Sequence, residues 1–311
     1  MSLPYLQPYL GLSNSLQTAQ ASAGGGTAGG RGVFGGGTAV SATIDYITID
    51  TTGNATDFGD LTVGRDSLTA GRSATRGIFA GGPSSPTNTM DYITIDTTGN
   101  ATDFGDLTAA RRGLGSVSSD TRFVVGGGYT GALSNVMDYV TIDTTGNATD
   151  FGDLTAANYS NNGVFNNTRG VFGGGANGLG AYRNTIEYIT IDTTGNATDF
   201  GDLTSVTGAP AGGLNNDTRG IFAGGYTGSH SNKIDYITIA STSNATDFGD
   251  LTTGRSGCAG VSTATRGVIG GGQLNSNVID YITIDSTGNA TDFGDLTVGR
   301  NSLAGCFNYV P

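Results

Sequence analysis

The chain has 311 residues, including 55 Gly, 14 Lys or Arg and 26 Asp or Glu, and its formal net charge is −12. This acidic balance argues against nucleic acid and anionic membrane surfaces as partners, because both require a basic patch. Dense glycine argues against long helices, and no run approaches 18 apolar residues, so a turn-rich β protein without a transmembrane helix is expected.

The chain begins with an apolar segment that carries no charged side chain. Pro4 and Pro8 disfavour a regular helix in its first turns. We expect residues 1–19 to form an N-terminal arm that either packs on the protein's own surface or anchors it to a second protein. The candidate anchor residues are Leu3, Tyr5, Leu6, Tyr9 and Leu10.

One repeat unit follows and occurs six times. It starts with R-G-V-F-G-G-G at Arg31, continues with D-Y-I-T-I-D from Asp45 and N-A-T-D-F-G-D-L-T from Asn54, and ends with a looser block related to R-x-x-L-A-G near Arg65. Successive D-Y-I-T-I-D blocks begin 46, 47, 49, 48 and 45 residues apart. A period of this length is typical of propeller blades and other repeat architectures.

Each block of the repeat has the pattern of a β-strand or a turn. Ile47 and Ile49 alternate with polar or aromatic neighbours, and the Val33–Phe34 pair reads as a buried strand that ends in glycine. T-T-G-N is a hairpin turn, and Phe58 anchors an outer strand. Four short strands per unit predict an all-β protein, a six-bladed β-propeller formed by residues 20–311.

The order of these blocks resembles the kelch repeat, in which a glycine doublet ends the second strand of each blade. Here Phe58 and its counterparts stand where kelch repeats have Trp, and Ile49 stands where they have Tyr. The resemblance covers residues 20–308 and implies kelch-like blades of four strands. The doublets are Gly36-Gly37, Gly81-Gly82, Gly127-Gly128, Gly174-Gly175, Gly224-Gly225 and Gly271-Gly272.

The near-identical D-Y-I-T-I-D-T-T-G-N-A-T-D-F-G-D-L-T units are also similar to repeat proteins of tailed phages from marine environments. That resemblance implies a component of the virion, which gives the expected location, and other virion proteins as partners of the arm.

Closure of the ring leaves two alternatives for the innermost strand of the first blade. Residues 300–308 carry a further copy of the innermost-strand block, without a second strand after them. Residues 20–29 occupy the corresponding place before Arg31 with weaker patterning. We expect the C-terminal copy to pair with the first glycine-ended strand and close the ring.

Acidic residues and arginines recur at the turns of every unit. Asp50, Asn54, Asp57 and Asp60 offer oxygen ligands, so calcium is conceivable, although capping of the turn by its own side chains is the simpler interpretation. No other cofactor is expected. The arginines before each second strand, such as Arg76, are interpreted as inter-blade contacts to carboxylates, with an anion-binding ring as the alternative.

The connections between the second and third strands vary most among the six units. They are either tolerated drift in loops or a recognition face for a host glycan or surface protein. The candidate recognition residues in them are Tyr129, Tyr182, Arg183, Tyr226, His230 and Lys233.

Catalytic patterns are absent from the sequence. His230 is its only imidazole, so a multi-histidine copper site cannot be assembled, and a Ser-His-Asp set would have to use this one loop residue. The carboxylate pairs are the same in all six units. The sequence therefore predicts a non-enzymatic structural or binding module, and the resemblance to phage repeat proteins implies its display on a phage tail or capsid. The alternative is a secreted or cell-surface lectin-like adhesin of a bacterium.

Overall fold

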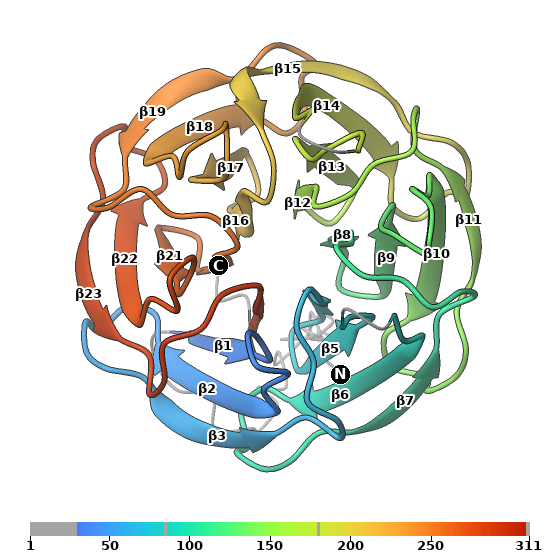
Figure 1. Ribbon diagram of the computed structural model, residues 1–311, viewed down its shortest axis with the longest axis horizontal. Helices are drawn as coiled ribbons and strands as arrows, with labels where there is room; N and C mark the ends of the chain where they lie inside the picture. The colour runs from blue at the N-terminus through green and yellow to red at the C-terminus, as the bar shows by residue number, and fades with distance from the viewer. Residues whose placement is uncertain (1–29, 84–85, 179–180, 309–311) are drawn as a thin grey trace, which may run out of the picture.

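The computed structural model describes residues 30–83, 86–178 and 181–308, and these form six four-stranded antiparallel sheets arranged in a ring (Figure 1). The expectation of an all-β, six-bladed β-propeller is confirmed. No helix in the described residues is long and apolar enough to cross a membrane. The predicted arm, with Leu3, Tyr5, Leu6, Tyr9 and Leu10, lies outside the described residues, as do residues 20–29.

Each blade contributes one innermost, one second, one third and one outer strand. The innermost strands of blades 1 to 6 are β24 (Ala304–Phe307), β4 (Thr69–Arg72), β8 (Gly115–Ser118), β12 (Asn162–Phe165), β16 (Ala211–Asn215) and β20 (Ala259–Ser262). The second strands are β1 (Arg31–Gly35), β5 (Arg76–Ala80), β9 (Arg122–Gly126), β13 (Arg169–Gly173), β17 (Arg219–Ala223) and β21 (Arg266–Gly270). The third strands are β2 (Thr43–Thr48), β6 (Thr89–Thr94), β10 (Val136–Thr141), β14 (Arg183–Thr190), β18 (Lys233–Thr238) and β22 (Val278–Thr283). The outer strands are β3 (Thr56–Asp60), β7 (Thr102–Asp106), β11 (Thr149–Asp153), β15 (Thr198–Thr207), β19 (Thr246–Asp250) and β23 (Thr291–Asp295).

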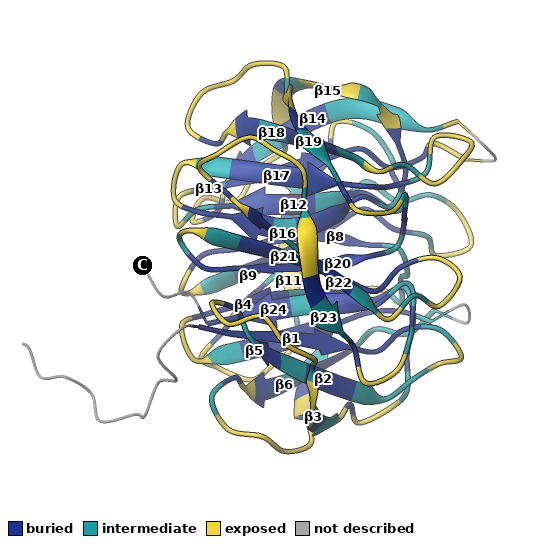
Figure 2. Ribbon diagram, turned by 90° about the vertical axis from the view of Figure 1, so that its left-hand side faces the viewer, coloured by how far each residue is buried: buried dark blue, intermediate teal, exposed yellow. Residues whose placement is uncertain are grey.

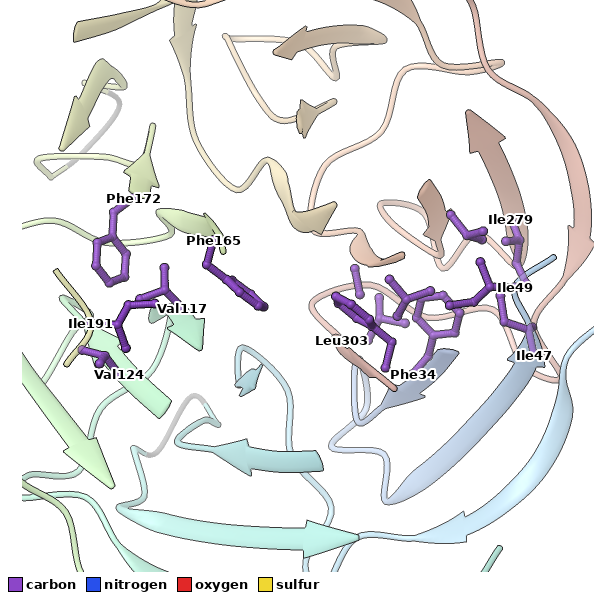
Figure 3. Close-up of a cluster of buried hydrophobic side chains, with 14 of the residues drawn as sticks. Phe34, Ile47, Ile49, Val117, Val124, Phe165, Phe172, Ile191, Ile279 and Leu303 are labelled. Carbon is purple, nitrogen blue, oxygen red and sulfur yellow. The ribbon is translucent and has the colours of Figure 1, made fainter. Parts of the chain in front are cut away.

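The core lies between neighbouring blades, and side chains from both faces of a blade enter it. In β2 the side chains of Ile44, Asp45 and Ile47 are buried while that of Tyr46 is half-buried, and Ile44 and Ile47 belong to different buried clusters. The glycine that ends β1 provides space for the next blade, because a Cβ on Gly35 would lie 2.6 Å from the ring of Phe79. Figure 3 shows part of this buried layer on both sides of the ring's centre.

The ring is closed by the C-terminal strand. β24 pairs antiparallel with β1, with Cys306 opposite Val33 and Phe307 opposite Gly32. The sheet order of blade 1 is β24-β1-β2-β3, so the first blade is built from both ends of the described chain. The expectation that residues 300–308 supply this innermost strand is confirmed.

The T-T-G-N turn of each blade covers the outer strand of the preceding blade. In blade 2 the N–H groups of Gly99 and Ala101 donate to the carbonyl oxygens of Phe58 and Asp60, both at 2.8 Å. The Asp60 N–H in turn donates to Oδ1 of Asn100 at 3.1 Å. These bonds occupy part of an otherwise open sheet edge, so the asparagine of N-A-T serves a contact between blades.

The arginine that begins each second strand also joins two blades. Arg76 donates from Nη1 to the carbonyl oxygen of Ile142 in the next blade at 2.7 Å, and its guanidinium lies 4.4 Å from the ring centre of Tyr92 in its own blade. The acceptor is thus a backbone carbonyl and not the expected carboxylate. The same pair of contacts is made by Arg31, Arg122, Arg169, Arg219 and Arg266.

Two faces result from this topology, and Figure 2 shows them edge-on with most exposed residues in their connections. The turn face carries the T-T-G-N turns. The loop face carries the variable connections between second and third strands, together with the links, defined here as the segments from each outer strand to the next innermost strand. Near the turn face the centre of the ring is filled by Phe165 and Phe307, stacked with ring centroids 6.4 Å apart, and by Arg72 beside both rings.

Candidate recognition surface on the loop face

The six links meet around the central opening of the loop face in a closed ring of backbone hydrogen bonds. The N–H of Ser67 donates to Ser302 O, and each following link donates in the same way to the one before it, at 2.8 to 3.1 Å. All six residues have φ between +50° and +65°. They are Ser67, Gly113, Ser160, Ala209, Gly257 and Ser302, and a solvent-open cavity of about 90 Å³ lies at their centre.

Four blades are fastened to their links by a buried ion pair. In blade 2 Arg65 Nη2 lies 2.6 Å from Asp91 Oδ2, both side chains are fully buried, and Arg65 Nη1 donates to the carbonyl oxygen of Thr89 at 2.7 Å. Thr62 Oγ1 donates to the other carboxylate oxygen at 2.6 Å. We call this arrangement the link clasp, and the equivalent pairs are Arg111–Asp138, Arg255–Asp280 and Arg300–Asp45.

Blades 4 and 5 lack the link clasp. Asn158 and Thr207 replace the arginine, and the buried carboxyl groups opposite them belong to Glu187 and Asp235. Each carboxyl still accepts a bond from a link backbone N–H, at 2.7 Å from Thr155 and 3.0 Å from Thr204. Burial raises the pKa of Glu187 and of Asp235 above the usual range of carboxyl groups.

Two of the candidate recognition residues lie beside these unclasped carboxyls. Arg183 Nη2 donates to the carbonyl oxygen of Ala157 at 3.2 Å, and Lys233 Nζ donates to Thr204 Oγ1 at 3.0 Å. Each cation counteracts in part the burial that raises the pKa of its neighbouring carboxyl. Arg183 and Lys233 therefore hold links to their blades where the usual arginine is missing.

The same region of the loop face carries a row of aromatic side chains. Tyr129 and Tyr159 meet edge to face with centroids 6.4 Å apart, and Arg112 lies within 5.7 Å of both ring centres. Tyr182 and Tyr226 meet in the same way at 5.5 Å. We call these four tyrosines, together with Arg112 and His230, the aromatic row.

The two halves of the aromatic row are joined through backbone. Ala176 exchanges both backbone hydrogen bonds with Tyr159, at 2.7 and 3.1 Å, and also forms a β-bridge with Tyr182. At the far end His230 lies 5.2 Å from Tyr226, and its Nδ1 is 3.1 Å from Ser256 Oγ in the next link. The row thus extends from blade 3 across blades 4 and 5 to the link before blade 6.

The structure therefore brings together four of the six candidate recognition residues, namely Tyr129, Tyr182, Tyr226 and His230. The tyrosines are half-buried and His230 is exposed, so their positions are fixed while part of each ring faces solvent. Tyr159 and Arg112 belong to the same row but were missed by sequence reasoning. Each of them directly follows the link residue that is equivalent to Arg65. The side chain at this position differs in charge and size among the six units, and this variation could have identified both residues from the sequence.

The remaining groups with metal or thiol chemistry are the acidic side chains, His230 and the two cysteines. No group of three or more His, Cys, Asp or Glu residues in the described part of the chain is placed to hold a metal ion. Cys258 and Cys306 are free and buried, and burial raises the pKa of Cys258 to about 11 and that of Cys306 further, so both remain protonated thiols at neutral pH.

Comparison with known proteins adds no family to this description. No protein-family model matches the chain, and no curated protein matches it. The fold is thus established by the six blades themselves, as a β-propeller whose architecture is consistent with a non-enzymatic binding module.

Proposed function

We propose that the protein is a non-enzymatic binding module of a phage particle, fixed through its N-terminal arm and recognising a host glycan with the aromatic row. The aromatic row is the observation that carries the proposal. It lies in the blades whose links depart most from the common pattern, and it presents tyrosine rings already held in place by neighbouring rings and backbone.

The chemistry of the row suits a carbohydrate. Tyrosine rings offer a flat apolar surface at low cost in side-chain entropy together with a hydroxyl group for hydrogen bonding. Thr130, Asn177, Thr227 and Ser229 are exposed in the adjoining loops and add neutral polar groups of the kind that bind hydroxyls. A site of this composition binds a ligand without requiring a catalytic group.

The placement of the chain ends supports display of this surface. β1 begins and β24 ends on the turn face, where the Asn308 N–H donates to the carbonyl oxygen of Arg31. The arm precedes β1 in the sequence, so an attachment through it would start on the turn face and leave the loop face directed outward. The similarity of the repeat units to repeat proteins of marine tailed phages supports the virion as the assembly.

A glycan array with purified protein tests the recognition step. The wild-type protein is expected to bind a subset of glycans, while Tyr159→Ala and Tyr226→Ala each lose that binding. Gln273→Ala is the matched control, because exposed Gln273 occupies in blade 6 the repeat position of Tyr226 and lies outside the row. An array that stays blank with the wild-type protein, or binding unaffected in both tyrosine variants, would overturn glycan recognition by the row.

Incorporation into particles tests the location separately. Purified particles assembled with the full chain are expected to contain it, and particles assembled with a chain lacking residues 1–19 are expected to contain much less. Equal incorporation of both chains contradicts anchoring by the arm. If the protein is found on a bacterial surface and not in particles, the alternative function as a cell-surface adhesin is favoured instead.

A further inference from the structure

The loop face carries a second feature on the side away from the aromatic row. Four aliphatic side chains there are exposed: Leu274 to 87%, Val63 to 60%, Val298 to 57% and Val40 to 50%. We call them the aliphatic patch. They account for four of the five large apolar side chains that are exposed among the described residues.

The segments that carry the aliphatic patch are neighbours around blades 6, 1 and 2. Asn301 Nδ2 donates to Asn275 Oδ1 at 3.2 Å, and the N–H of Thr38 donates to Asn301 O at 2.9 Å. On the other side the N–H of Arg65 donates to Ser41 O at 3.0 Å. The loop of blade 6, the link into blade 1, the loop of blade 1 and the link into blade 2 therefore form one continuous surface.

Two residues of the aliphatic patch have a backbone conformation that is unusual for their side chains. Val40 has φ +56° and Leu274 has φ +63°, in the left-handed region where Gly or Asn is the ordinary choice and a β-branched residue is an outlier. Such strain is found mainly where function requires the side chain. Residues 38–42, 62–64, 273–277 and 296–299 also contain no charged side chain, so the patch is suited to an uncharged apolar partner.

The chain itself contains such a partner. Residues 1–29 have no charged side chain and include Leu3, Tyr5, Leu6, Tyr9 and Leu10. They precede Gly30 on the turn face, and 29 residues span at most about 100 Å. In a head-to-tail arrangement the arm of one copy meets the loop face of the next copy directly.

We propose that the aliphatic patch is the docking site for the N-terminal arm of a second copy of this chain. This rests on the proposed role of the arm as an anchor and names the partner it holds. The contact is heterologous, since arm and patch are different surfaces, and it therefore generates an open chain of copies unless the rotation between them closes a ring. Because a chain segment is narrower than a whole blade face, the aromatic row over blades 3 to 5 stays accessible.

Sedimentation of purified proteins tests the pairing of arm and patch. Wild-type protein is expected to form concentration-dependent oligomers, whereas both a chain lacking residues 1–19 and the patch variant Val298→Asp/Leu274→Asp sediment as monomers. The control Thr253→Asp places a charge on an exposed link residue at the repeat position of Val298, outside the patch and the row, and is expected to oligomerise like the wild type. Equal thermal melting curves confirm that the variants fold.

Mixing the two defective chains gives the decisive result. The patch variant retains the arm and the truncated chain retains the patch, so the mixture is expected to form a complex of one copy of each and to stop there. Introducing Val298→Asp into the truncated chain, which supplies the patch in this complex, should weaken the complex at least about tenfold, since the burial of one aliphatic side chain contributes about that much to affinity.

Every other result overturns the proposal. A monomeric wild-type protein would mean that the arm covers its own patch or binds elsewhere, and oligomers of the truncated chain would mean that patches pair with each other. Glycan binding by the patch variant is measured in parallel, and it reports on the aromatic row independently of self-association.

Discussion

A buried guanidinium and a buried carboxylate contribute to stability only as a pair. In blade 2 the burial of Arg65 lowers its pKa below the ordinary value, while the adjacent charge of Asp91 acts in the opposite direction. In blade 4 the carboxyl of Glu187 is also buried, but no arginine of the described residues forms an ion pair with it, and the charge of Arg183 offsets its burial only in part. Neutralising the buried carboxyl group is therefore expected to affect stability differently at these equivalent positions of two repeats.

Neutralising these two carboxyls measures the difference. Asp91→Asn is expected to lower the free energy of unfolding by about 3 to 5 kcal/mol, because it leaves Arg65 buried without a counter-charge. Glu187→Gln is expected to leave it unchanged or higher at neutral pH, since a glutamine still accepts the Thr155 N–H and needs no desolvation of a charge. Chemical denaturation at pH 7 compares them, and equal losses in both variants would contradict the assignment of the link clasp.

The pH dependence of stability follows from the same two groups. Burial raises the pKa of Glu187 above 4.5 and that of Asp235 above 3.8 in the folded protein, so the folded chain retains protons that the unfolded chain has released. Their contribution to stability is therefore present below those values and is lost as the pH rises through the raised pKa values. The stability difference between Glu187→Gln and the wild type should grow across this window, and a difference that is flat from about pH 4 to 8 would contradict it.

The ring of links contains backbone strain that substitution can relieve. Ala209 has φ +50° and Gly257 has φ +64° at equivalent positions, and only glycine adopts this conformation without a steric penalty. Ala209→Gly is expected to raise the free energy of unfolding by about 0.5 kcal/mol after the entropy of the unfolded chain is counted. Gly257→Ala should lower it by at least about 1 kcal/mol, and the opposite order in denaturant titrations would contradict the strain.

At the scale of elements, closure of the ring depends on β24. Its four residues pair with β1, and the side chain of Cys306 lies in the core beside Gly77 of the next blade. Backbone amides of β24 are therefore expected to exchange with solvent as slowly as those of β20, which is the innermost strand of a blade formed from consecutive residues. Hydrogen exchange followed by mass spectrometry measures both, and fast exchange confined to β24 would show that the ring opens there.

Most elements could be predicted from the sequence because each repeat block has one structural role. The alternation around Ile47 and Ile49, the glycines that follow Phe34 and the innermost-strand block after Arg300, which no second strand follows, depend on local pattern and copy number. They indicated the strands, the blades and the closure. The acceptor of Arg76 could not be predicted, since a backbone carbonyl of another blade has no sequence signature. The hydrogen bond between Asn100 and the outer strand of the preceding blade could likewise not be predicted, because the two blades become neighbours only in the assembled ring.

At the scale of the whole molecule the loop face divides into two halves that the sequence did not separate. Individual variable residues such as Tyr129 and Tyr226 were identified, but their alignment into one row depends on backbone bridges through Ala176. The aliphatic patch combines Val40 and Val298, which lie far apart in the chain but on segments that become neighbours because the last link leads into the first blade. Closure of the ring thus brings residues of different repeats together on one surface, and this proximity cannot be predicted from the sequence of a single repeat.

The exterior of the ring is acidic. The outer strand of every blade carries two aspartates that are exposed or half-buried, such as Asp103 and Asp106 in β7, and the chain has a net charge of −12. Self-repulsion of this kind lowers the stability of the compact state and is screened by salt within about 10 Å at 0.1 M. The melting temperature should therefore rise with added NaCl.

Calcium should raise the melting temperature no more than magnesium at equal ionic strength, because the described residues offer no cluster of three acidic or other strong ligands to hold the ion. Calorimetric melting in the two chlorides compares them, with NaCl of the same ionic strength as the control. A saturable increase specific to calcium would instead indicate a site built from backbone and asparagine oxygens at the T-T-G-N turns. Asn147→Ala, which also removes the acceptor of the Asp106 N–H, would then abolish that increase at one turn, whereas screening alone would be unaffected by it.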